Sequence, residues 1–141
     1  MATDLEKMMN DYFAAWNTHD VEKMLSFFTD DIVYEDVAMG KVNRGKKELK
    51  DGISYTFVDF SDFKLEIKSS FIAGDRGAVE WVMSGAFVHS SVPGLRATGK
   101  RFSVRGASII EFRKGKISRG SDYWDRATLD QQVGLMPGPP R

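Results

Sequence analysis

The chain has 141 residues, no cysteine, 42% hydrophobic residues and a formal net charge of zero, from 20 basic and 20 acidic side chains. This length suits one domain whose core can also enclose a small-molecule pocket. The lack of cysteine excludes disulfides, thiolate metal sites and thiol nucleophiles, and the balanced charge argues against nonspecific nucleic-acid binding. Every apolar stretch is short and interrupted by charge, so we expect neither a membrane span nor a signal peptide.

Few residue types remain for chemistry. The two histidines, His19 and His89, are too few for a histidine-based metal site, so no metal is expected. No glycine-rich phosphate loop or nucleotide motif occurs, and no organic cofactor is expected either. Any reaction would use carboxylates, hydroxyls and an apolar cavity, in a protein that we expect to be cytoplasmic.

The start of the chain predicts two short helices. Thr3 and Glu6 have the spacing of a capping box, and apolar residues recur at helical intervals over residues 5–16. Asp20 is expected to cap a second helix, whose apolar stripe ends at Phe28. The period of the apolar pattern changes after this point.

The rest of the chain predicts a third helix, then strands. Turn residues at 43–45 precede a helix from Lys46 to about Phe57, and from Asp62 onward apolar and charged residues alternate, as in half-buried strands. Strands are expected over 31–37, from 62 onward, and over 78–89, 102–112 and 116–125; a short helix at 128–133 ends a single domain of residues 1–134, before a Pro/Gly-rich tail at 135–141. Three helices followed by an antiparallel meander indicate an α+β fold, with the helices on one face of the sheet.

Three segments, DYFAAWNTHDVEKMLSFFTDDIVYED, ATGKRFSVRGASIIEFRKGKIS and SDYWD, together resemble the SnoaL-like polyketide cyclase branch of the nuclear-transport-factor-2-like superfamily. The resemblance spans roughly residues 5–130. It implies a cystatin-like α+β barrel, in which three N-terminal helices close a curved antiparallel sheet into a cone-shaped pocket, and it implies a homodimer. The same fold serves isomerases, cyclases, epoxide hydrolases, dehydratases and non-catalytic binding subunits, so the function has to be argued from the site.

Asp36 is the first candidate acid–base residue. Strand alternation places it on the same face as Tyr34, where loss of solvent would raise the pKa of its carboxyl group. The resemblance to ketosteroid isomerases gives Asp36 the position of their proton-shuttling Asp and Tyr12 that of a catalytic Tyr. A second oxyanion donor, an Asp in those enzymes, aligns with Ser108, a weaker donor that counts against steroid isomerisation. The alternative is that Asp36 caps a turn and Tyr12 belongs to the core.

Asp122, in the segment SDYWD, is the second candidate. By resemblance it matches the acid or base of SnoaL-like cyclases and limonene-epoxide hydrolases, and alternation puts it on the same face as Trp124. The alternative is a solvent-exposed aspartate on an edge strand. Asp125 is expected to cap the short C-terminal helix instead.

Epoxide hydrolysis is disfavoured. Epoxide hydrolases of this fold need an Arg-x-Asp pair that aligns here with Trp81 and Met83, although Tyr34 matches their water-holding tyrosine. Without a second carboxylate and its arginine, the relay that protonates an epoxide is missing.

An aromatic pocket is the third expectation. Trp81, Met83 and Phe87 share one strand face, and Trp16 and Phe57 are expected to point at the same space from the helices. Ordinary core packing is the alternative for each of them. The full set of expected ligand-binding residues is Trp16, Phe57, Trp81, Met83, Phe87, Ser108 and Trp124, while His89 is expected at the surface unless a bulge brings it to the pocket rim.

These residues support a hypothesis of carboxylate acid–base catalysis on a small hydrophobic ketone. Asp122, with Asp36, would move a proton at carbon, and Tyr12 or Tyr34 would donate to the developing oxyanion, in an aldol cyclisation or a double-bond isomerisation. Two carboxylates in one cavity repel each other, so one should keep its proton near neutral pH. The alternative is a non-catalytic small-molecule-binding or dimerisation module, which would leave the two carboxylates exposed or far apart.

Overall fold

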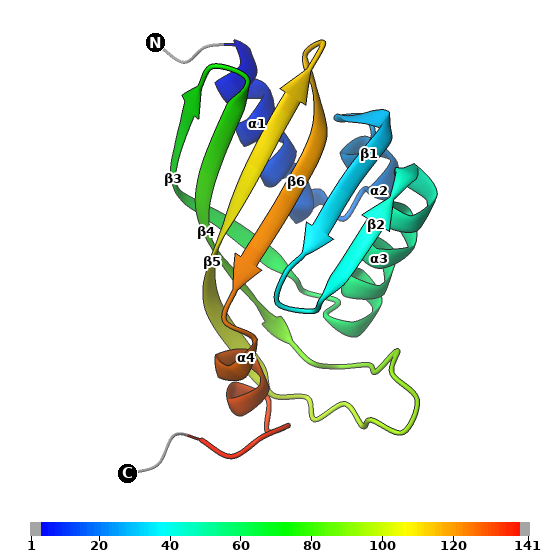
Figure 1. The fold of residues 1–141 in the computed structure, drawn as a ribbon. Coiled ribbons are helices and arrows are strands. Elements are labelled where there is room, and N and C mark those ends of the chain that lie inside the picture. The colour runs from blue at the N-terminus through cyan, green and yellow to red at the C-terminus, as the bar shows by residue number, and fades with distance from the viewer. Residues whose placement is uncertain (1–3, 139–141) are drawn as a thin grey trace.

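Six strands form one curved sheet, and the longer helices α1 and α3 lie against one face of it (Figure 1). The computed structural model describes residues 4–138. Its elements are α1 (Asp4–Ala15), the 3-10 helix η1 (Trp16–Thr18), α2 (Val21–Leu25), β1 (Phe28–Asp36), β2 (Lys41–Arg44), α3 (Gly45–Asp59), β3 (Lys64–Ala73), β4 (Arg76–Ala86), β5 (Arg101–Arg113), β6 (Lys116–Trp124) and α4 (Arg126–Gln132). The α+β class predicted from the sequence is confirmed.

The sheet order is β2-β1-β6-β5-β4-β3, and its central pair β1–β6 is parallel. The meander is antiparallel over β3, β4, β5 and β6, as predicted, but the sheet as a whole is mixed. The reason is α3, which carries the chain from the β2 edge of the sheet to the β3 edge (Figure 1). The meander then returns across the sheet and ends beside β1, the strand that came first.

Two local predictions were wrong. Phe28 begins β1 and does not belong to the second helix, which ends at Leu25. Phe28 is fully buried in the core, so hydrophobicity alone could not distinguish the end of a helical stripe from the start of a strand. Residues 41–44 form the short strand β2 where turn residues were expected, because four residues are too few to show a period.

Two predicted helix caps are present, and a third lies outside the described residues. Asp20 accepts a hydrogen bond from the backbone N–H of Lys23 at the start of α2, and Asp125 accepts one from Thr128 at the start of α4. Thr3, half of the predicted capping box, lies outside residues 4–138. Within that range no helix is long and apolar enough to cross a bilayer.

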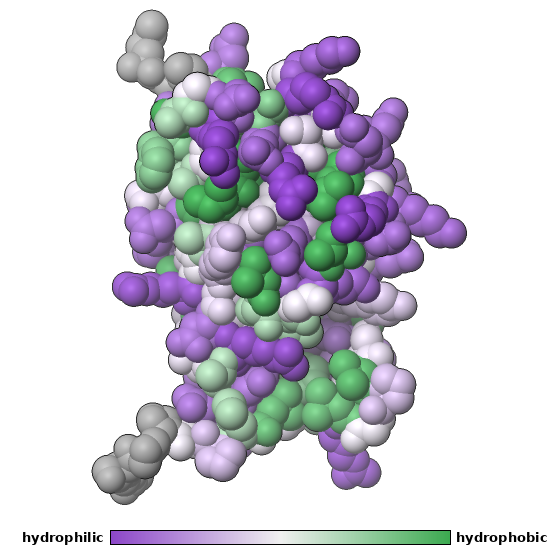
Figure 2. Space-filling model, viewed as in Figure 1, coloured by the Kyte–Doolittle hydropathy of each residue, from purple (hydrophilic) through white to green (hydrophobic). Residues whose placement is uncertain are grey.

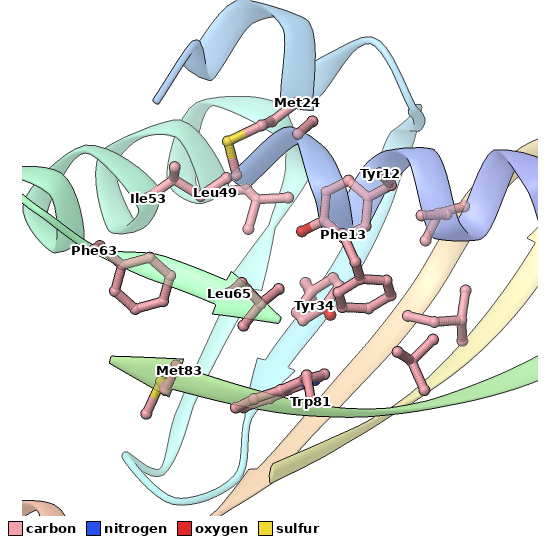
Figure 3. Close-up of a cluster of buried hydrophobic side chains, with 14 of the residues drawn as sticks. Tyr12, Phe13, Met24, Tyr34, Leu49, Ile53, Phe63, Leu65, Trp81 and Met83 are labelled. Atoms are coloured by element: carbon pink, nitrogen blue, oxygen red, sulfur yellow. The ribbon is translucent and has the colours of Figure 1, made fainter. Parts of the chain in front are cut away.

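The core lies between the helices and the concave face of the sheet. Tyr12 of α1 makes edge-to-face contacts with Phe13 and Phe28, with ring centroids 4.9 Å apart in both cases. Figure 3 shows Tyr12 reaching from α1 toward Tyr34, with Trp81 and Met83 below them. The fully buried side chains of this core are Met9, Tyr12, Met24, Phe28, Ile32, Val79, Ser108, Ile110, Ile117 and Val133.

Figure 2 shows that apolar side chains are exposed among polar ones on the face of the sheet that the helices do not cover. Pairing of the strands places Phe71, Ala78, Ile109 and Ser121 side by side across β3, β4, β5 and β6, and the Phe71 and Ile109 side chains are exposed. A homodimer that paired two sheets would cover this row. The homodimer stays a prediction.

The end of α1 is tied to the edge strand β3 by Asn17. Its side-chain amide donates to the carbonyl of Leu65 and accepts from the N–H of Leu65, both at 2.8 Å. Next to it His19 takes a left-handed conformation, stacks on Phe57 at 4.2 Å and contacts the carbonyl of Phe63. Residues 17–19, where the helical pattern breaks, therefore attach the end of α1 to the β3 edge of the sheet.

Replacing Asn17 with alanine should lower the free energy of unfolding by about 1 kcal/mol, because both hydrogen bonds to the β3 edge are lost. The measurement is chemical denaturation. Asn10→Ala is the control: the buried Oδ1 of Asn10 has no hydrogen-bond partner among residues 4–138, and alanine favours the α1 helix. An Asn17→Ala protein as stable as the Asn10→Ala protein would contradict this account.

Candidate functional site

Asp122 is the centre of the site because three strands bring polar side chains to it. It lies in β6, paired with Ser108 of β5 on one side and with Asp36 of β1 on the other. Paired residues in neighbouring strands direct their side chains to the same face of a sheet. Here that is the concave face, where Tyr34 also lies.

One oxygen of Asp122 accepts two short hydrogen bonds. The hydroxyls of Tyr34 and Ser108 both donate to Oδ1, each at 2.6 Å. Such lengths are typical of a hydroxyl donating to a charged carboxylate. Oδ2 receives no hydrogen bond from residues 4–138, and it is not fully buried. Asp122 as a whole keeps part of its surface exposed. Oδ2 is therefore the atom that is free to meet a substrate or carry a proton.

An indole group, which can only donate, fixes the direction of the Ser108 hydrogen bond. Trp81 Nε1 donates to Ser108 Oγ at 2.9 Å, so the single proton of Ser108 is left for Asp122. On the helix side, Trp16 Nε1 donates to the hydroxyl of Tyr12 at 3.2 Å. On the sheet side the donors thus run from Trp81 through Ser108 to the Asp122 carboxylate.

Burial raises the pKa of Asp122 from 3.8 to about 7, against the opposing effect of the Ser108 and Tyr34 hydrogen bonds. The charge of Asp36 raises it as well. A carboxyl group with this pKa is present in both protonation states at neutral pH, which is the property that a general acid or base needs.

Asp36 both caps a turn and lies beside Asp122. Its Oδ1 accepts from the backbone N–H of Met39 at 3.1 Å and from Trp124 Nε1 at 3.0 Å. Burial raises the pKa of Asp36, and these two hydrogen bonds oppose the rise. The turn-capping role given as the alternative is therefore present, and Asp36 is also paired with Asp122 across β1 and β6.

Tyr12 and Tyr34 are held as neutral phenols. Burial, followed by the charge of Asp122, raises the pKa of both hydroxyls above the ordinary value of 10. The Tyr34 proton is directed at Asp122. Tyr12 is almost fully buried on the helix side of the core.

The predicted aromatic residues lie around this centre but divide into two groups. Trp81 and Met83 are buried in β4, and Phe87 is buried directly after it. The Trp81 indole donates to Ser108, and Phe87 packs on Phe60. Trp16, Phe57 and Trp124 are partly exposed: Trp16 and Phe57 meet edge-to-face at 5.6 Å, and Trp124 binds Asp36.

Two hollows at the surface of residues 4–138 are not lined by the predicted site residues. One of about 440 Å³ lies between α2 and α3, and one of about 320 Å³ lies between β5 and the start of α4. The side chains of Tyr34, Trp81 and Met83 are all buried in the core beneath the helices (Figure 3). The cone-shaped ligand pocket therefore stays a prediction.

His89 lies at the surface, as expected. Its ring Nδ1 is 3.0 Å from Asp59 Oδ1 at the end of α3, and more than half of its side chain is exposed. The neighbouring Ser91 donates to the same carboxylate from its hydroxyl. His89 therefore belongs to the anchor of the loop that follows β4.

Sequence reasoning missed two glycines of this site. A Cβ atom at Gly120 would lie 2.3 Å from a ring carbon of Tyr34, and one at Gly106 would lie 2.3 Å from a ring carbon of Trp81. The signal was present: a glycine inside a strand often marks the close approach of another group. The alternation of apolar residues in β5 and β6 alone gives these two positions no role.

Comparison with known proteins identifies the family of the chain. Residues 6–133 match the family model of the SnoaL-like polyketide cyclase. The chain is 32% identical over 125 residues to the cyclase aurE of Calcarisporium arbuscula, which covers 85% of this chain and 87% of that protein.

Two solved structures show the same fold. A Catenulispora acidiphila protein of ketosteroid isomerase-like fold, solved in complex with trimethylamine, superposes with a TM-score of 0.80 at 22% identity over 95% of this chain and 98% of its own. TsrD from Streptomyces laurentii gives a TM-score of 0.81 at 23% identity over 94% of this chain and 96% of its own. With the family match across nearly the whole domain, the chain belongs to the SnoaL-like polyketide cyclase family.

Proposed function

We propose that this protein moves a proton at carbon on a small hydrophobic ketone, with Asp122 as the acid–base residue. Membership of the family supports a function of the cyclase or isomerase type. The single observation that carries the role of Asp122 is the state of its carboxylate. Oδ1 accepts from two hydroxyl groups, Oδ2 is free, and the pKa is raised to about 7.

In the proposed reaction, Oδ2 of ionised Asp122 removes a proton from the carbon next to the substrate carbonyl. The electron pair of the broken C–H bond forms an enolate. That enolate can attack a second carbonyl of the same molecule, and the alkoxide formed then takes the proton from Asp122, which completes an aldol cyclisation. In a β,γ-unsaturated ketone the dienolate instead takes the proton back from Asp122 at the γ-carbon, which completes a double-bond isomerisation. Neither outcome needs an oxidant or a reductant.

The two tyrosines have different parts in this proposal. Tyr34 and Ser108 hold Oδ1, which keeps Oδ2 pointed at the substrate. Tyr12, whose hydroxyl accepts from Trp16 and lies within hydrogen-bond reach of the Tyr34 hydroxyl, is the tyrosine that we assign to the substrate oxygen. Trp16, Phe57, Trp81, Met83, Phe87 and Trp124 would surround the apolar part of the ligand.

The position of the two carboxylates favours catalysis over a binding module. Asp36 and Asp122 are directly paired across β1 and β6, and both are partly buried. A module that only binds or dimerises has no need for two carboxylates in such surroundings, because each one costs free energy when it is ionised.

Asp122→Asn should reduce proton transfer at carbon by about 100-fold or more, the range that a general acid or base contributes. The assay is deuterium exchange at the α-carbon of 2-tetralone, a small bicyclic aromatic ketone, followed by NMR in heavy water. Asp125→Asn is the matched control, since asparagine keeps the α4 cap. Exchange by the wild-type protein should increase as the pH rises through about 7, where Asp122 becomes ionised.

Two outcomes of this assay would contradict the proposal. Full exchange by the Asp122→Asn protein would remove Asp122 from the mechanism. Binding of aromatic ketones by the wild-type protein, seen as a raised melting temperature, without any exchange above the buffer rate would favour the binding module.

Asp122 should lower the free energy of unfolding by about 1.4 kcal/mol for each pH unit between about pH 4 and 7, and Asp122→Asn should remove this contribution. The folded state keeps the Asp122 proton up to about pH 7, whereas the unfolded chain loses it near 3.8. The stabilising contribution is therefore complete below pH 4 and is lost as the pH rises to 7. The measurement is urea denaturation of both proteins across this range; parallel pH curves for the two would show that Asp122 is not the group responsible.

A further inference from the structure

The same local arrangement occurs twice in neighbouring strands. β5 contains Arg-Gly-Ala-Ser at residues 105–108, and β6 contains Arg-Gly-Ser-Asp at residues 119–122. In each strand the glycine is paired with an aromatic residue of the next strand: Gly106 with Trp81, and Gly120 with Tyr34.

In both cases the aromatic residue binds the polar residue two positions after the glycine. Trp81 donates to Ser108 at 2.9 Å, and Tyr34 donates to Asp122 at 2.6 Å. A ring that lies across its paired glycine can point its polar atom along the strand to the next residue on the same face. Ser108 and Asp122 are themselves paired across β5 and β6, and the Ser108 hydroxyl donates to Asp122. Both arrangements therefore end at the Asp122 carboxylate.

Only the rings require glycine at these two positions. Neither Gly106 nor Gly120 is among the glycines with positive φ, so another residue could adopt the backbone conformation. A Cβ atom would instead lie 2.3 Å from Trp81 Cη2 at Gly106 and 2.3 Å from Tyr34 Cε2 at Gly120, well inside van der Waals contact. Both rings are buried, so they cannot move aside without disturbing their other neighbours.

We propose that Gly106 and Gly120 are positioning residues, whose missing side chains let Trp81 and Tyr34 lie across the strands and direct their donors to Ser108 and Asp122. The inference rests on the proposed function, because it explains how Oδ1 is held while Oδ2 works on the substrate. It also predicts that each glycine acts through one identified ring.

The test is the titration of the Asp122 carboxyl carbon, followed by NMR in the protein without substrate. Gly120→Ala should move the midpoint upward by about one pH unit, as Tyr34→Phe should, because a donor to the charged carboxylate is lost in both. Gly85→Ala is the control, since Gly85 also lies buried in a strand but its Cβ would come no closer than 3.3 Å to another atom. The control should leave the midpoint unchanged.

A second pair of variants tests whether the ring is the cause. In a Tyr34→Ala protein the space above Gly120 is empty, so adding Gly120→Ala should change neither the midpoint nor the free energy of unfolding. The same comparison tests the role of the ring if Gly120→Ala alone does not fold, because the double variant without the Tyr34 ring should fold. Gly106→Ala with and without Trp81→Ala repeats the test independently on β5.

Two results would overturn the inference. One is a folded Gly120→Ala protein in which Asp122 titrates as in the wild type; the other is an equal effect of Gly120→Ala with and without the Tyr34 ring. Neither measurement uses a substrate. An Asp122→Asn protein that keeps full exchange activity would contradict the proposed function alone, and an unchanged titration in Gly120→Ala would contradict this inference alone.

Discussion

The site depends on one carboxylate that is removed from water and held by two hydroxyl groups. Burial alone would drive Asp122 toward its neutral form, while the hydrogen bonds from Tyr34 and Ser108 favour the charged form. The balance leaves the pKa at about 7, so that a residue type which is ordinarily ionised at neutral pH can both take and return a proton. The surrounding aromatic residues serve this balance: they exclude water, and the Trp81 indole fixes the direction of the Ser108 proton.

The topology of the sheet is what brings this constellation together. Tyr34 and Asp36 come from the first strand, whereas Ser108 and Asp122 come from the last two, and only the parallel β1–β6 pair sets them side by side. That pairing exists because α3 carries the chain across to the β3 edge before the meander begins. In a sheet that followed the chain order, Asp36 would lie far from Asp122, and the coupling between the two carboxylates would be lost.

Much of the fold could be predicted because its signals are local. Helical spacing in α1, alternation in β3 and the caps at Asp20 and Asp125 each depend on a few neighbouring residues. Strand alternation likewise put Tyr34 and Asp36 on one face of β1, and Asp122 and Trp124 on one face of β6. In the folded sheet these are the same face. The parallel pairing, the bond from Tyr34 to Asp122 and the ring positions over Gly106 and Gly120 depend on residues far apart in the chain. No spacing rule within a single segment contains that information.

The most direct test of the account is the pKa of Asp122 in the free wild-type protein, measured from the pH titration of its side-chain carboxyl carbon by NMR. The account predicts a midpoint near 7, because desolvation outweighs the two hydroxyl donors. A midpoint close to the ordinary value of 3.8 would mean that Asp122 stays ionised at neutral pH like a surface aspartate, and would contradict the central claim.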